Sequence, residues 1–201
     1  MIMKKLVMIF TCLVLCLSFG SCNNTEKQNE EARECLNRVL GKEQSFSYKC
    51  LVSDKITEES LEKFNFKTEY SALNSFVPQA YTYIDFDSDG IDELLIVDMK
   101  LKYFLILRYD DKIVNGYILE NISLQDIKTD GSFLTVRYNS CATINKVSFD
   151  GLDYEVINLA YKDDSENTYQ LNQESAAKDE VEKYFDDWNE NTTKISWTTI
   201  G

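Results

Sequence analysis

The middle of the chain alternates short apolar runs with polar segments. Between residues 81 and 161, apolar side chains recur at the spacing of β-strands. The runs cover residues 81–84, 93–99, 103–109, 113–119, 133–138, 142–149 and 154–161. Most connections carry Asp, Asn or Gly, which favour tight turns, whereas a parallel crossover needs about a dozen residues or more. The pattern predicts a mainly antiparallel sheet.

The regions on either side of these strands carry the apolar spacing of amphipathic helices. The first helix ends before a glycine cap, Gly41, and the second takes Asn172 or Ser175 as its N-cap. The apolar positions are Ala32, Cys35, Leu36, Val39 and Leu40 in the first, and Ala177, Val181, Tyr184, Phe185 and Trp188 in the second. Strands between helices predict an α+β fold, with N-terminal and C-terminal helices packed against the sheet.

The segment between the first helix and the sheet has a mixed pattern. Residues 46–52 alternate apolar and polar side chains and predict a strand. Thr57 can cap a short helix that runs to Phe64, and residues 71–76 favour another helical turn. With one proline and seven glycines in the chain, no Pro/Gly-rich linker divides the sequence, so we expect residues 31–201 to form a single α+β domain.

The N-terminal segment has the layout of an export signal. Lys4 and Lys5 precede an apolar run of 14 residues, 6–19, which ends at the small residues Gly20 and Ser21. A transmembrane helix needs about 20 apolar residues to cross a bilayer, so this run is too short to span one. The pattern therefore favours a signal that is cleaved.

This segment resembles a bacterial lipoprotein signal, in which small residues precede a cysteine that is acylated. Gly20 and Ser21 fit before Cys22, whereas Phe19 stands where such signals usually have leucine. The resemblance implies a signal peptide at residues 1–21, a lipid on Cys22 and a lipidated tether at residues 22–30, on the extracytoplasmic side of a bacterial membrane. The alternative is ordinary cleavage near Ser21, which leaves a secreted protein with a free Cys22.

The chain is acidic. Its formal net charge of −13 becomes −15 without residues 1–21, because two lysines and no acidic residue are lost. Binding to a polyanion needs clustered Lys and Arg, and the 19 basic residues that remain form no run. We therefore expect contact with a membrane through the lipid anchor and no nucleic-acid binding. The remaining possible partner is an extracytoplasmic protein or glycan.

Three cysteines follow Cys22, namely Cys35, Cys50 and Cys141. Export permits a disulfide, and an odd number leaves one thiol over. Cys35 and Cys50 lie on the apolar faces of a predicted helix and a predicted strand, so this pair either forms a bridge or fills the core as small apolar side chains. The cysteines have no CxxC spacing and no accompanying histidine, which disfavours metal binding by them.

The segment 85–93 carries acidic residues at regular spacing. Asp85, Asp87 and Asp89 occupy loop positions 1, 3 and 5, and their carboxylates converge if the chain turns sharply at Gly90. Ile91 at position 7 offers its carbonyl oxygen, and Glu93 at position 9 offers a further carboxylate. Hard oxygen ligands in a flexible loop suit Ca²⁺ better than Mg²⁺ or Zn²⁺. The spacing therefore predicts a calcium site.

The loop differs from an EF-hand, because position 12 is Ile96 and the flanking runs are strand-like. It resembles the D-x-D-x-D-G-x-x-[DE]-L calcium loop of FG-GAP and VCBS-type repeats, and uncharacterised bacterial lipoproteins that carry one such copy. The resemblance implies side-chain ligands at Asp85, Asp87, Asp89 and Glu93, and a carbonyl ligand at Ile91. A single motif cannot build the propeller of the repeat family. The alternative is an acidic β-turn without metal, in which the carboxylates bond nearby N–H groups.

The absence of histidine limits the remaining chemistry. It excludes Ser-His-Asp, Cys-His and His-ligated zinc sites. Carboxylate pairs can hydrolyse glycans, but the many acidic residues single out no pair, and aromatics such as Trp188 and Trp197 are more typical of a core than of a sugar site. We therefore expect a non-catalytic cell-envelope lipoprotein with a structural calcium loop. The alternatives are an extracellular carbohydrate- or protein-binding module and an acid-catalysed glycan hydrolase.

Overall fold

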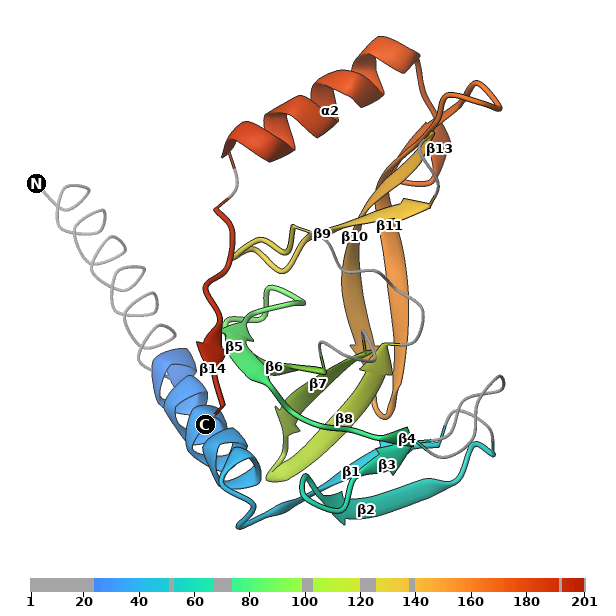
Figure 1. Cartoon of the computed structure of the whole chain (residues 1–201). Helices are drawn as coiled ribbons and strands as arrows, with labels where there is room; N and C mark the ends of the chain where they lie inside the picture. The colour runs from blue at the N-terminus through green and yellow to red at the C-terminus, as the bar shows by residue number, and fades with distance from the viewer. Residues whose placement is uncertain are drawn as a thin grey trace, which may run out of the picture.

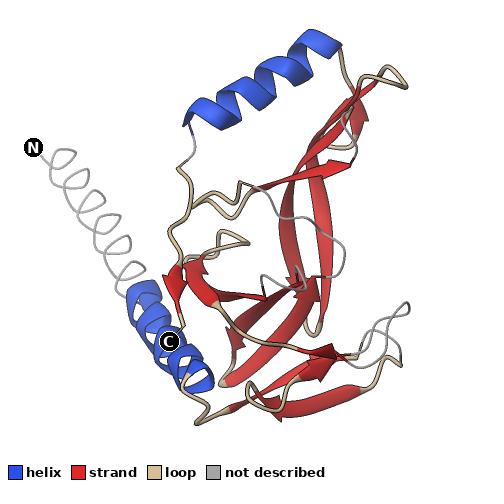
Figure 2. Cartoon of the chain, viewed as in Figure 1, coloured by secondary structure: helices blue, strands red, loops and turns tan. Residues whose placement is uncertain are grey.

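A computed structural model describes most of the chain after residue 23. The described residues are 24–50, 53–66, 74–98, 103–119, 126–137, 140–191 and 193–200. They contain two helices, near the N-terminus and the C-terminus, and two mostly antiparallel sheets, which confirms the α+β class (Figures 1 and 2). The predicted signal peptide, Cys22 and the first residues of the tether lie outside the described residues.

The large sheet has seven strands in the order β14-β5-β6-β7-β8-β1-β2. All neighbours in it are antiparallel except β1 and β8, which are parallel. Its strands are β1 (Ser45–Lys49), β2 (Ile56–Ser60), β5 (Ala80–Ile84), β6 (Glu93–Asp98), β7 (Tyr103–Asp110), β8 (Ile113–Leu119) and β14 (Thr198–Thr199). The predicted strands between residues 81 and 119 are therefore confirmed and lie next to one another.

The small sheet has five strands in the order β13-β12-β11-β10-β9, all antiparallel. Its strands are β9 (Phe133–Arg137), β10 (Cys141–Asp150), β11 (Asp153–Asp163), β12 (Thr168–Leu171) and β13 (Glu174–Ser175). A separate two-stranded ribbon pairs β3 (Asn65–Phe66) with β4 (Asn74–Ser75). The sequence pattern predicted one sheet, and the structure contains two because the long β10–β11 hairpin belongs to its own meander.

The large sheet is buried on both faces. Every residue of β6 is buried, and alternate side chains point to opposite faces of a strand. Leu94 and Ile96 join a core with Leu36 of the N-terminal helix, whereas Leu95 joins a second core with Val147 of β10. The large sheet is thus a central layer between the N-terminal helix and the small sheet, and its continuous apolar runs suit two-sided burial.

A β-bulge interrupts the β10–β11 hairpin. The register shifts between Ile144 and Asn145, which leaves Leu159 of β11 as an extra residue. On one side of the bulge, Ile144 and Ala160 pack against α2 (Lys178–Asn191). On the turn side of the bulge, Val147 packs against the large sheet. One hairpin therefore contributes to two cores, and α2 lies across the part farther from the large sheet (Figure 1).

Both predicted helices form. Residues 24–40 are helical, and the helix ends before Gly41, as its pattern predicts. Residues 24–30 belong to this helix, although the sequence suggested a tether there. The predicted N-caps of the second helix are wrong, because α2 begins at Lys178 and the N–H of Ala177 donates to the carboxylate of Glu180, at 3.3 Å. Glu180 thus makes one half of a capping box, in which a glutamate of the first turn accepts the N–H of the residue before the helix.

The prediction of short helices between residues 57 and 76 is wrong. Residues 56–60 form β2, in which Thr57 pairs with Tyr48 of β1, so pairing with a neighbouring strand prevails over the capping signal. Residues 74–75 form β4, and residues 71–73 lie outside the described residues. In the described part of the chain no disulfide joins Cys35 to Cys50, and both side chains are partly buried. No described helix is long and apolar enough to cross a membrane.

The chain after α2 returns to the large sheet. The N–H of Thr129 donates to the carbonyl of Thr193 at 2.8 Å, and the N–H of Ile195 donates to the carbonyl of Ile127 at 3.1 Å. β14 then pairs with β5 at the edge of the large sheet, beside the N-terminal helix (Figure 1). The last described residues thus connect the two sheets.

Gly116 allows β8 to pack tightly beneath Phe46. A Cβ atom at this position would lie 2.6 Å from the Phe46 ring. We predict that Gly116→Ala lowers the free energy of unfolding by about 1–3 kcal/mol, because the ring must shift within a packed core. The measurement is urea unfolding followed by circular dichroism. Phe46→Ala removes the clashing ring atoms, so the double variant should lose less stability than the sum of the single variants, and strict additivity would contradict the predicted clash.

Candidate metal site

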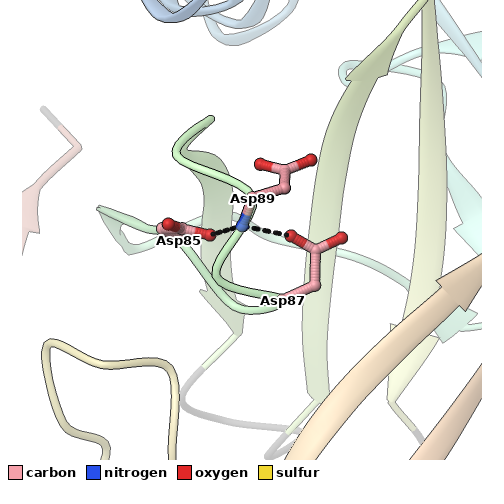
Figure 3. A group of neighbouring side chains, drawn as sticks. All are labelled: Asp85, Asp87 and Asp89. Atoms are coloured by element: carbon pink, nitrogen blue, oxygen red, sulfur yellow. Dashed lines mark hydrogen bonds between the residues drawn. The ribbon is translucent and has the colours of Figure 1, made fainter. Parts of the chain in front are cut away.

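The acidic residues predicted as ligands lie in the connection between β5 and β6. One carboxylate oxygen of each of Asp85, Asp87 and Asp89 lies within 4.8 Å of the others. In Figure 3 the carboxylates of Asp85 and Asp87 face the backbone nitrogen of Asp89 from either side, and the Asp89 carboxylate lies above them. Asp85 and Asp87 are partly buried, and Asp89 is exposed. The structure therefore brings together three of the predicted side-chain ligands, and this triad is an arrangement that can hold a metal ion.

The carboxylates themselves shape the loop. The two oxygens of Asp85 accept the N–H groups of Asp89 at 3.1 Å and Gly90 at 3.0 Å, and Oδ1 of Asp89 accepts the N–H of Ile91 at 2.7 Å. Asp87 Oδ1 lies 3.4 Å from the same Asp89 nitrogen (Figure 3). These bonds are those of the metal-free acidic turn, and they also hold the carboxylates together for a cation.

Gly90 is required by the loop for two reasons. Its φ is +88°, a left-handed conformation that strains other residues. A Cβ atom there would also lie 2.7 Å from the Thr25 side chain, on the N-terminal helix. Ser88 also has a positive φ, +65°, which places two left-handed residues within one tight loop. The predicted role of Gly90 in the turn is thus confirmed.

Glu93 lies apart from the triad. It is the first residue of β6, its side chain is fully buried, and its Oε2 accepts the N–H of Phe86 at 2.8 Å. Its Oε1 has no hydrogen-bond partner among the described residues. The ligand roles that the resemblance implies for Glu93 and for the Ile91 carbonyl remain predictions.

Arg108 of β7 is a member of the site that the sequence analysis missed. Its Nη2 lies 3.2 Å from Oδ2 of Asp87 and 3.0 Å from Oδ2 of Asp89, and its Nε lies 3.4 Å from Oε1 of Glu93. The register of the β6–β7 hairpin could have identified it. Leu94 pairs with Leu107, so the next pair of positions places residue 108 opposite residue 93. Arg108 places a positive charge beside the carboxyl groups of Asp87, Asp89 and Glu93.

Burial governs the charge of Glu93. Desolvation raises the pKa of its carboxyl to about 9, and the N–H of Phe86 and the charge of Arg108 offset only part of this rise. Burial and the neighbouring Asp89 also raise the pKa of Asp87. Glu93 thus favours its protonated form in the absence of a metal.

The loop contacts three other parts of the fold. Asp92 accepts a hydrogen bond from Asn29 at 2.9 Å and pairs with Arg33 at 2.7 Å, both on the N-terminal helix. The Lys146 ammonium of β10 donates to the hydroxyl of Ser88 at 3.2 Å. The loop therefore touches the N-terminal helix, the large sheet and the small sheet, and its order is coupled to all three.

Comparisons of the chain with protein-family models, with curated proteins and with solved structures found no match. The resemblance to the FG-GAP and VCBS-type loop therefore rests on residues 85–93 and on their geometry. In that segment the structure brings Asp85, Asp87 and Asp89 together.

The raised pKa of Glu93 predicts a pH dependence in calcium-free protein. Between about pH 4.5 and 9 the folded state keeps a proton that the unfolded chain has released, so stability falls as pH rises. We expect Glu93→Gln, which mimics the protonated acid, to remove this component, about 1 kcal/mol per pH unit. The measurement is urea unfolding in EDTA from pH 5 to 9. Parallel pH profiles for the wild type and the variant would contradict the assignment.

Proposed function

We propose that the chain is an exported, non-catalytic lipoprotein of the bacterial cell envelope, anchored by a lipid on Cys22, whose domain is stabilised by calcium in the loop 85–93. The observation that carries the proposal is the convergence of Asp85, Asp87 and Asp89 within 4.8 Å. The lipoprotein-like signal at residues 1–22 supports the location, and the acidic charge of the chain is consistent with a partner other than nucleic acid.

The charges of the site suit a divalent cation. Three aspartates beside Arg108 leave an excess of two negative charges, and one Ca²⁺ neutralises this excess. Calcium takes about 6–8 oxygen ligands, so three carboxylates need further oxygens. The Ile91 carbonyl, Glu93 and water are the candidates, and water has access because the Asp89 side chain is 38% exposed.

The proposed role of the ion is structural. Extracellular calcium modules bind with dissociation constants of about 10⁻⁴ to 10⁻³ M. At ten times its dissociation constant, calcium stabilises a fold by RT ln 11, about 1.4 kcal/mol. Because the loop contacts the N-terminal helix and both sheets, calcium binding stabilises the contacts between these elements. A protein or glycan in the extracytoplasmic space is the proposed class of partner.

Calcium is expected to raise the unfolding temperature of the wild type by about 3–5 °C at ten times its dissociation constant. Asp87→Ala should abolish this increase, since it removes one ligand and leaves both Asp85 hydrogen bonds to the backbone in place. The matched control is Asp186→Ala, because Asp186 is an exposed aspartate of α2 that lies outside the triad. The measurement is differential scanning calorimetry in calcium and in EDTA. Equal melting of the wild type in both conditions would refute the calcium site.

The lipid anchor predicts a membrane-bound protein that takes up labelled palmitate when expressed in a bacterium. Cys22→Ala should lose the label and leave the membrane fraction, because the acyl chains have no other attachment point. Cys16→Ala, which changes a cysteine inside the apolar run 6–19, is the matched control and should keep the label. An unlabelled wild type would instead support ordinary cleavage near Ser21.

A further inference from the structure

Arg108 occupies a mostly buried position on the inner side of the acidic loop. Its side chain is 18% exposed, and its guanidinium lies 5.5 Å from the centre of the Phe149 ring of β10. One nitrogen, Nη2, contacts Oδ2 of both Asp87 and Asp89. The arginine therefore bridges two members of the triad and is itself held in place by the small sheet.

We propose that Arg108 is an internal counter-cation that competes with calcium for Asp87 and Asp89 and so sets the calcium affinity of the loop. The inference rests on the proposed calcium site. Without metal, the guanidinium relieves the repulsion between the carboxylates. When calcium binds, the same positive charge lies beside a divalent ion and opposes it, because both cations draw on the same two carboxylates.

A second, independent observation indicates that the metal-free arrangement is incomplete. Oε1 of Glu93 and Nε of Arg108 are both buried, and neither has a hydrogen-bond partner among the described residues. The two atoms are 3.4 Å apart, without hydrogen-bond geometry. Buried polar groups without a partner are costly. A small movement of Arg108 away from the triad and toward Glu93 satisfies both atoms and frees the two aspartates.

The contacts of Arg108 allow such a movement. Its Nη1 already lies 3.9 Å from Oδ2 of Asp110, on the same strand and away from the triad. Asp110 and Glu93 together offer carboxylate oxygens for a guanidinium that has left Asp87 and Asp89. Calcium binding therefore exchanges the partners of Arg108 and does not leave its charge unpaired.

This competition predicts two effects of opposite sign for one substitution. Removing the charge of Arg108 weakens the metal-free loop, because the carboxylates then repel one another. It also strengthens calcium binding, because the competitor is gone. An arginine that merely supports the loop in both states would leave the calcium affinity unchanged or lower it when removed. The two measurements together distinguish competition from support.

The experiment is calorimetric titration of calcium chloride into the full-length chain in detergent, with unfolding temperatures recorded in EDTA. We expect Arg108→Gln to bind calcium about tenfold more tightly, equivalent to about 1.4 kcal/mol, and to unfold at a lower temperature in EDTA. Arg108→Lys keeps the charge and should stay within about threefold of the wild-type affinity. The control is Arg38→Gln, which removes the charge of an exposed arginine on the N-terminal helix and should leave the affinity unchanged.

The outcomes separate the inference from the proposed function. If the wild type binds calcium and Arg108→Gln binds with equal or lower affinity, the inference is wrong and the calcium site stands. If only Arg108→Gln binds, the competition is supported and the proposed calcium function of the natural chain is wrong. If neither protein binds calcium, both are wrong.

Discussion

Two-sided burial of the large sheet is the constraint on which the rest of the fold depends. β6 and β7 carry apolar side chains on both faces, so each face must be covered by another layer. The N-terminal helix covers one face and the turn half of the β10–β11 hairpin covers the other. The acidic loop leaves the sheet between these two layers, which explains why Asp92 meets the helix while Ser88 meets β10.

The same placement determines the electrostatics of the loop. Because this end of the sheet is covered, Glu93 is buried, and burial raises the pKa of its carboxyl to about 9. The side chains of Asp87 and Asp89 are more exposed, and Arg108 and solvent balance their charge. Within one short loop, the fold thus separates a buried acid from a partly exposed triad.

The features that depend on local spacing were predictable from the sequence. Asp85, Asp87 and Asp89 converge because alternate residues of a tight turn point inward and Gly90 permits that turn. Strands β5 to β11 follow from the short apolar runs between residues 81 and 161, whereas β12, β13 and β14 were not predicted. β2 was missed because its sequence, from Ile56 to Ser60, is polar and acquires strand structure only by pairing with β1.

Features that depend on distant partners were not predictable in this way. The parallel pairing of Tyr48 with Gly116 joins segments far apart in the chain, and no local pattern marks it. Arg108 belongs to the site only because the hairpin register places it beside Glu93, so its role required the pairing and not the residue type alone. The division into two sheets likewise depends on which strands pair, and no local pattern determines this.

The bulge in the β10–β11 hairpin has a consequence for how the domain unfolds. The same two strands supply side chains to the core under α2 and to the core on the large sheet. Loss of packing in one core therefore disturbs the packing of the other. The two sheets are therefore expected to behave as one cooperative unit, and their amides to exchange with solvent through a shared opening event. The β10–β11 hairpin thus couples the unfolding of the two sheets, so that they form a single domain.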